Sequence, residues 1–98
     1  MNDEKSAFLN MTRLPARLDA AQVATLLGFA EHDIVVLVRR KLLKPLGIPA
    51  PNAHKYFPSV EILENAKDRG WLDKATQAVT KHWQEKNKKV PVELKNAA

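Results

Sequence analysis

The sequence predicts one small, mainly α-helical domain in which two short helices near the middle of the chain cross steeply. Three observations lead to this prediction. Residues 19–28 carry the signals of a capped helix that ends at a glycine, residues 31–41 suit a second helix, and a proline-rich stretch then interrupts the helical pattern until residue 58. With 98 residues the chain is long enough for one hydrophobic core and too short for two.

The composition is that of a folded protein in a reducing compartment. Apolar residues make up 45% of the chain and charged residues 28%, which is unlike a disordered sequence. There is no cysteine, so disulfides and thiolate metal sites are excluded. The first six residues carry two acids where a secretion signal needs basic and apolar residues, and no apolar run has membrane-spanning length. We therefore expect a cytoplasmic protein without membrane contact.

Positive charge is concentrated in two segments. The net charge is +5, and residues 39–55 hold five basic side chains and no acidic one. Residues 81–98 add a net +3, whereas residues 1–38 and 56–80 are slightly acidic. A polyanionic partner would meet the middle and the tail of the chain, although basic residues also serve simply to keep a small protein soluble.

The chain divides into an N-terminal arm at 1–16, a folded domain at 17–87 and a flexible basic tail at 88–98. The first helix of the domain has clear signals at both ends. Asp19 can cap the first free amides, and Gln22 can reach back to complete a capping box. Leu18 and Val23 have the spacing of a hydrophobic staple, and Gly28 suits a left-handed turn that ends the helix.

The segment 31–41 begins with acids and ends with bases, which complements a helix dipole at both ends. Because four of its residues are β-branched, a buried strand is the alternative. We favour the helix, and the spacing described below is the reason.

An irregular hairpin is predicted from Leu42 to Phe57. The segment contains residues that exclude a continuous helix, namely Pro45, Gly47, Pro49 and Pro51. Asn52 and Ala53 would lie near its tip, and residues 55–57 would form the returning strand.

Two further helices are expected toward the C-terminus. Ser59 is a candidate N-cap for the first, which Gly70 would end. The second begins at about Trp71 and carries an apolar face made of Leu72, Ala75, Val79 and Trp83.

The strongest pattern is the spacing of residues within 20–37. Two short helices that cross steeply need apolar residues where they touch, a small residue where the backbones approach, and a permissive residue in the turn. One register meets all seven demands, with Val23, Ala24, Leu27, Gly28, Phe29, Ile34 and Leu37 at positions four, five, eight, nine, ten, fifteen and eighteen counted from Ala20. Any pair of helices in a small bundle could also bury such residues.

The run from Leu18 to Phe29, the basic hairpin, and Lys55-Tyr56-Phe57 leading into Val60-Glu61-Ile62-Leu63 resemble the excisionase and MerR-like winged helix-turn-helix family over residues 17–67. The resemblance implies a mainly α fold with a short β-hairpin wing and two C-terminal helices. It also implies a recognition helix at 33–41 that enters the major groove of double-stranded DNA, and a wing at 43–57 beside it.

The candidate DNA contacts follow from that resemblance and from phosphate neutralisation by basic side chains. They are His32, Val35, Val36, Arg39, Arg40 and Lys41 on the recognition helix and Lys44, His54 and Lys55 on the wing. The sequence departs from the family here, because Glu31 is acidic and the two valines could touch only thymine methyl groups. The alternative is therefore a protein-interaction module that kept the scaffold and uses the valines as a docking patch.

Catalysis and cofactor binding are not expected. The three histidines are far apart and lack the spacing of metal ligands, and no nucleophile is paired with a base. The predicted function is sequence-specific binding of double-stranded DNA, as a transcriptional regulator or an architectural factor. A homodimer through the C-terminal helix is a further expectation.

Overall fold

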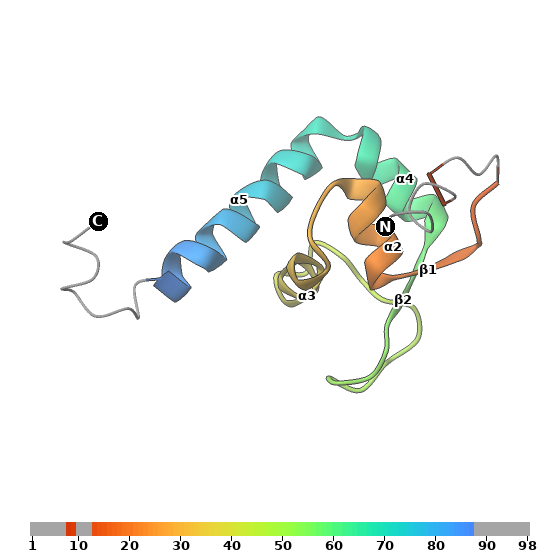
Figure 1. The fold of residues 1–98 in the computed structure, drawn as a ribbon, viewed down its shortest axis with the longest axis horizontal. Helices are drawn as coiled ribbons and strands as arrows, with labels where there is room; N and C mark the ends of the chain where they lie inside the picture. Colours follow the sequence, from red (N-terminus) through yellow and green to blue (C-terminus); the bar gives the residue numbers. More distant parts are fainter. Residues whose placement is uncertain (1–7, 10–12, 88–98) are drawn as a thin grey trace.

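The computed structural model describes residues 8–9 and 13–87. This part of the chain forms four helices and a two-stranded antiparallel sheet, and Figure 1 shows how they are arranged. In chain order these are β1 (Arg17–Asp19), α2 (Ala20–Leu27), α3 (Glu31–Arg39), β2 (Tyr56–Pro58), α4 (Ser59–Lys67) and α5 (Arg69–Asn87). The mainly helical fold class is confirmed. The predicted tail at 88–98 and most of the predicted arm at 1–16 lie outside the described residues, although Phe8 from the arm is buried in the core.

Helix α2 has the bounds and both caps that the sequence predicts. The Asp19 carboxylate accepts a hydrogen bond from the backbone N–H of Gln22 at 2.8 Å, and the Gln22 side chain accepts one from the Asp19 N–H at 3.0 Å. Gly28 adopts a left-handed conformation with φ of +83°, and its N–H donates to the carbonyl of Ala24. Local hydrogen bonding therefore fixes where α2 begins and ends.

Replacing Gly28 with alanine is expected to lower the free energy of unfolding by about 1–2 kcal/mol, because a side chain strains this left-handed backbone. No atom lies within 4 Å of the Cβ that would be added, so strain is the whole cost. Gly70→Ala is the matched control, since Gly70 lies in α5 and alanine favours a helix there by about 0.5–1 kcal/mol. Denaturant unfolding measures both, and equal stability of the two variants would contradict the expectation.

The segment after Gly28 is a helix and not a strand. α3 runs from Glu31 to Arg39, two residues earlier at each end than the predicted recognition helix at 33–41. It ends early because Lys41 adopts a left-handed conformation with φ of +63°. α2 and α3 are joined by residues 28–30 and meet at 96°, which is the steep crossing that the spacing predicts.

The predicted returning strand exists, but its predicted partner was wrong. β2 pairs with β1, the strand that precedes α2, and Leu18 lies opposite Phe57. The outgoing half of the loop is joined to β2 by a backbone hydrogen bond from the Leu46 N–H to the Tyr56 carbonyl, at 2.8 Å. Prolines have no N–H to donate, so a segment with prolines at 45, 49 and 51 cannot supply a regular ladder. The segment between α3 and β2, which extends away from the helices in Figure 1, is therefore an irregular loop, here called the 40–55 loop.

One hydrophobic core joins all of these elements. Its most deeply buried side chains are Leu18, Val23, Ile34, Leu37, Phe57, Ile62 and Ala75. Leu18 and Phe57 share the inner face of the sheet, so the strand pair attaches the base of the 40–55 loop to the helices.

Two predicted helix boundaries near α4 are corrected. Ser59 is the first helical residue and makes no capping hydrogen bond with its side chain. α4 ends at Lys67, and Gly70 lies inside α5 instead of ending α4. The reason is Asp68, whose carboxylate accepts the Trp71 N–H at 3.1 Å and so starts a new helix two residues earlier than predicted.

Hydrogen bonds from two tryptophans join α5 to α3 and to the residues just after it. The indole N–H of Trp71 donates to the Leu42 carbonyl, just beyond the C-terminal end of α3, at 3.0 Å. The indole N–H of Trp83 donates to the Asp33 carboxylate in the first turn of α3, also at 3.0 Å. Between them Ala75 is fully buried and Val79 packs against the core.

Candidate nucleic-acid interface

Helix α3 presents one uncovered stripe to solvent. Ile34 and Leu37 are buried in the core, and Asp33 bonds to α5. The exposed side chains of Glu31, Val35 and Arg39 recur every four residues along a single side, and His32 is exposed at the edge of that side, toward α5. Val35, in the middle, is 51% exposed, so the rest of the described chain does not cover this stripe.

Val36 is not part of that stripe, and its prediction as a contact was wrong. Its side chain is only 3% exposed, so it can touch neither DNA nor a protein partner. Consecutive residues on a helix point about 100° apart. Val36 lies one helical turn from both Asp33 and Arg40, which contact α5, so Val36 is on the covered side of α3 and Val35 remains free.

Two other predicted contacts lie toward α5. The His32 ring packs edge-on against Trp83, with 5.3 Å between ring centroids and an interplanar angle of 85°. The Arg40 guanidinium is paired with the Glu85 carboxylate at 3.5 Å. Both side chains of that pair are exposed, so it contributes little to stability. It does partly neutralise the charge that Arg40 would bring to a phosphate.

The uncovered stripe borders a groove between α3 and the 40–55 loop. The groove has a volume of about 480 Å³ and is lined by Ala20, Ile34, Val35, Val38, Arg39, Pro51, Asn52, Ala53, Lys55 and Phe57. Three of the predicted contacts, Val35, Arg39 and Lys55, thus meet at one place. The helix and the loop form a single continuous surface there.

Lys55 has a role in this surface that the sequence did not indicate. Its ammonium group donates to the carbonyl of Pro51 at 2.9 Å and to that of Ala53 at 3.3 Å. An ammonium has three N–H donors, so one remains for a phosphate. Lys55 therefore holds the end of the loop in shape and also lines the groove.

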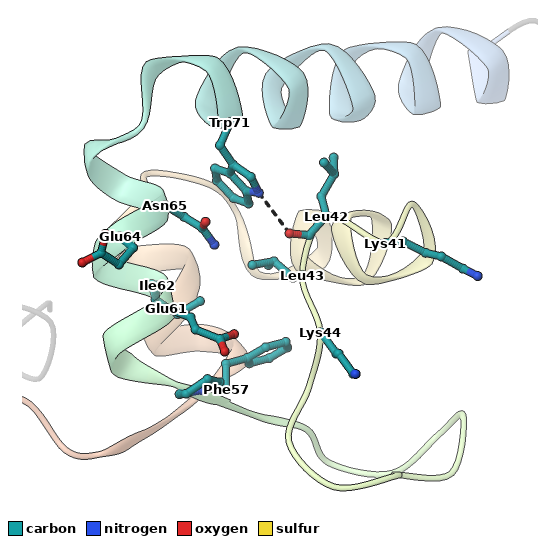
Figure 2. Close-up of a pocket in the computed structure, with 11 residues that line it drawn as sticks. Lys41, Leu42, Leu43, Lys44, Phe57, Glu61, Ile62, Glu64, Asn65 and Trp71 are labelled. Carbon is teal, nitrogen blue, oxygen red and sulfur yellow. Dashed lines mark hydrogen bonds between the residues drawn. The ribbon is translucent and has the colours of Figure 1, made fainter.

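Lys41 and Lys44 lie at a second hollow, on the side of the loop that faces α4. Figure 2 shows both side chains pointing away from the Trp71–Leu42 hydrogen bond, while Glu61 and Glu64 are on the opposite wall. This hollow of about 410 Å³ thus carries both signs of charge. The two lysines are exposed, and they do not share the groove beside α3.

Sequence reasoning missed two residues on the outer face of the sheet. The guanidinium carbon of Arg17 lies 4.2 Å from the centroid of the Tyr56 ring, and the ring of His54 lies 5.0 Å from the same ring on the loop side. Side chains on a strand point alternately to its two faces, so the neighbours of buried Leu18 and Phe57 must point outward. This would have revealed the cluster if the β1–β2 pairing had been predicted.

The described residues contain no group of three or more histidine, cysteine or acidic side chains that could hold a metal ion. In the same part of the chain no single helix is long and apolar enough to cross a membrane, and the bent pair of α2 and α3 meets that test only when taken together. Comparison of the chain with known protein families, with curated proteins and with solved structures found no match.

Proposed function

We propose that the chain is a sequence-specific, double-stranded DNA-binding protein of the winged helix-turn-helix kind, acting as a transcriptional regulator or an architectural factor. In this proposal α3 is the recognition helix and the 40–55 loop is the wing. The observation that carries it is the uncovered stripe of α3, which lies beside a groove shared with the 40–55 loop, a segment that begins with Arg40 and Lys41 and contains no acid.

The charges along α3 are compatible with this role. Asp33 is 8% exposed, and its carboxylate accepts two N–H groups, so it does not face a DNA backbone. Glu31 is the one acid on the uncovered stripe, and it can accept a hydrogen bond from a cytosine amino group. Arg39 ends the stripe beside the loop, where a phosphate or a guanine edge would lie.

Binding to a random duplex of about 20 base pairs across a salt series tests the proposal. We expect micromolar-range affinity at low salt and a steep, linear decrease of log K with log salt concentration, because bound cations release counterions from the DNA. Selection of a preferred sequence would follow. Absence of binding even at low salt would overturn the proposal.

A protein-interaction module is the second candidate, favoured by exposed apolar side chains on α3 and on the 40–55 loop. Val35 is half exposed, and Ile48 on the loop is fully exposed. The docking patch predicted from both valines loses Val36, because Val36 is buried, and these two exposed residues are the ones that a partner could contact. Val35→Lys with Ile48→Lys separates the candidates. If the wild type binds DNA and the added lysines preserve or strengthen that binding, the DNA-binding candidate is supported. If the wild type has no affinity for DNA, the protein-interaction candidate is supported.

A homodimer through α5 remains a prediction. The apolar residues Ala75, Ala78 and Val79 are in contact with the protein's own core. The opposite side of α5 is polar, with exposed Thr76, Gln77, Thr80, Lys81 and Gln84. A dimer through α5 would therefore use polar contacts, and sedimentation at high protein concentration measures whether it forms.

A further inference from the structure

We propose that Arg17, stacked on Tyr56, forms a second contact with a DNA phosphate, on the outer face of the two-stranded sheet. This inference rests on the proposed function, and it adds a contact residue on β1, outside α3 and the 40–55 loop. The cluster is defined by Arg17, Tyr56 and His54.

The strand register places these side chains on one face. Leu18 and Phe57 are opposite each other and both are almost fully buried, so their inner face belongs to the core. Side chains alternate along a strand, and Arg17 and Tyr56 therefore point outward. β2 emerges directly from the 40–55 loop, as Figure 1 shows, so the cluster lies at the base of the proposed wing.

The stacking fixes the guanidinium and leaves its edge free. With its central carbon 4.2 Å from the ring centroid, the Arg17 guanidinium is attracted by the face of Tyr56. A guanidinium held on an aromatic face still offers N–H donors along its edge, in the fork that matches two phosphate oxygens. Tyr56 is itself supported by the His54 ring, with 5.0 Å between the two centroids.

The acid on the outer face of β1 is already engaged. Asp19 lies opposite Tyr56 in the register, but its carboxylate accepts the Gln22 N–H and caps α2. Within the described residues the ion pairs join His32 to Asp33 and Arg40 to Glu85, and none involves Arg17. An exposed, orientated arginine that has no carboxylate partner in the described part of the chain is suited to an external anion, and the neighbouring acid-free loop favours DNA as the source of that anion.

The test measures binding of a fluorescent random duplex of about 20 base pairs across a salt series. Arg17→Ala is expected to reduce the slope of log K against log salt by about 0.9 and to weaken binding about eightfold near 0.1 M salt, as the loss of one phosphate contact requires. Arg17→Lys should keep the slope and bind more weakly than the wild type, since it keeps the charge and loses the fork. Tyr56→Leu should also weaken binding although no charge changes, whereas Tyr56→Phe keeps the stacking and should match the wild type.

Arg69→Ala is the matched control, because Arg69 is an exposed arginine on a different element, at the start of α5. If the wild type binds and Arg17→Ala has no larger effect than Arg69→Ala, the inference is overturned and the proposed function stands. If the wild type itself does not bind, both are overturned. Equal affinity of Tyr56→Leu and Tyr56→Phe would show that stacking does not position Arg17, which also contradicts the inference.

Discussion

Replacing Asp33 with alanine is expected to lower the free energy of unfolding by about 2–4 kcal/mol, a large part of the stability of so small a domain. One carboxylate oxygen of Asp33 accepts the Ala30 N–H at 3.1 Å, and the other accepts the Trp83 indole N–H at 3.0 Å. The group also lies in the first turn of α3, where the helix dipole favours a negative charge. Alanine would remove all three interactions and leave the indole N–H of a half-buried tryptophan without its partner.

Two further variants separate the contributions to this decrease in the free energy of unfolding. Trp83→Phe removes one of the two hydrogen bonds and keeps an aromatic ring, so we expect a decrease of about 1–2 kcal/mol. Asp33→Asn keeps the volume and one acceptor oxygen but points an NH2 group at one of the two donors, so its decrease should lie between those of the other variants. Denaturant unfolding with a common m-value measures all three. If Asp33→Ala proved no less stable than Trp83→Phe, the capping of α3 by Asp33 would contribute nothing.

The features that the sequence predicted correctly depend on residues close together in the chain. The capping box of α2 joins Asp19 to Gln22, and the turn after α2 needs only a glycine in a left-handed conformation. The steep crossing of α2 and α3 follows from apolar spacing within fewer than twenty residues. Such signals can be read directly, because their geometry is set by the local backbone.

The predictions that failed depend on contacts between distant segments. Which strand pairs with β2 is decided by burial of Leu18 against Phe57, and nothing near residue 57 indicates a partner at residue 18. The burial of Val36 depends on how α5 packs against α3. These two helices are joined by a hydrogen bond between Asp33 and Trp83, which lie fifty positions apart in the sequence. The spacing of apolar residues predicts that a helix has a buried and an exposed face, but it does not predict which neighbouring element covers each face.

The candidate interface shows the same division. Its basic segment and the exposed positions Val35 and Arg39 were predictable from charge and helical spacing. The pairing of Arg40 with Glu85 and the bonds from Lys55 to loop carbonyls were not, because both need the folded positions of other segments. These contacts determine which cations are free to bind a phosphate in the proposed complex, and therefore which cations a charge-removal variant should replace.

Removing the three remaining cations of the basic segment together is expected to weaken DNA binding by about two to three orders of magnitude near 0.1 M salt. The variant is Arg39→Ala with Lys41→Ala and Lys44→Ala, all exposed residues. Arg40 and Lys55 are left in place, because each already has a partner in the protein. If each of the three cations neutralises one phosphate, the slope of log K against log salt concentration should fall by about 2.7. The salt series described for the wild type measures both quantities.

A second triple variant separates the position of the charges from their number. Lys67, Lys74 and Lys81 are exposed on α4 and α5, and their replacement by alanine lowers the net charge by the same amount. If DNA binds along α3 and the 40–55 loop, this control should lose only the weak, long-range part of the attraction, about threefold or less at moderate salt. If the two variants lost affinity equally, net charge alone would attract the DNA and the uncovered stripe of α3 would have no special part in binding. A large loss confined to the first variant would instead assign the contact to the cations at the end of α3 and the start of the 40–55 loop, on both sides of that loop.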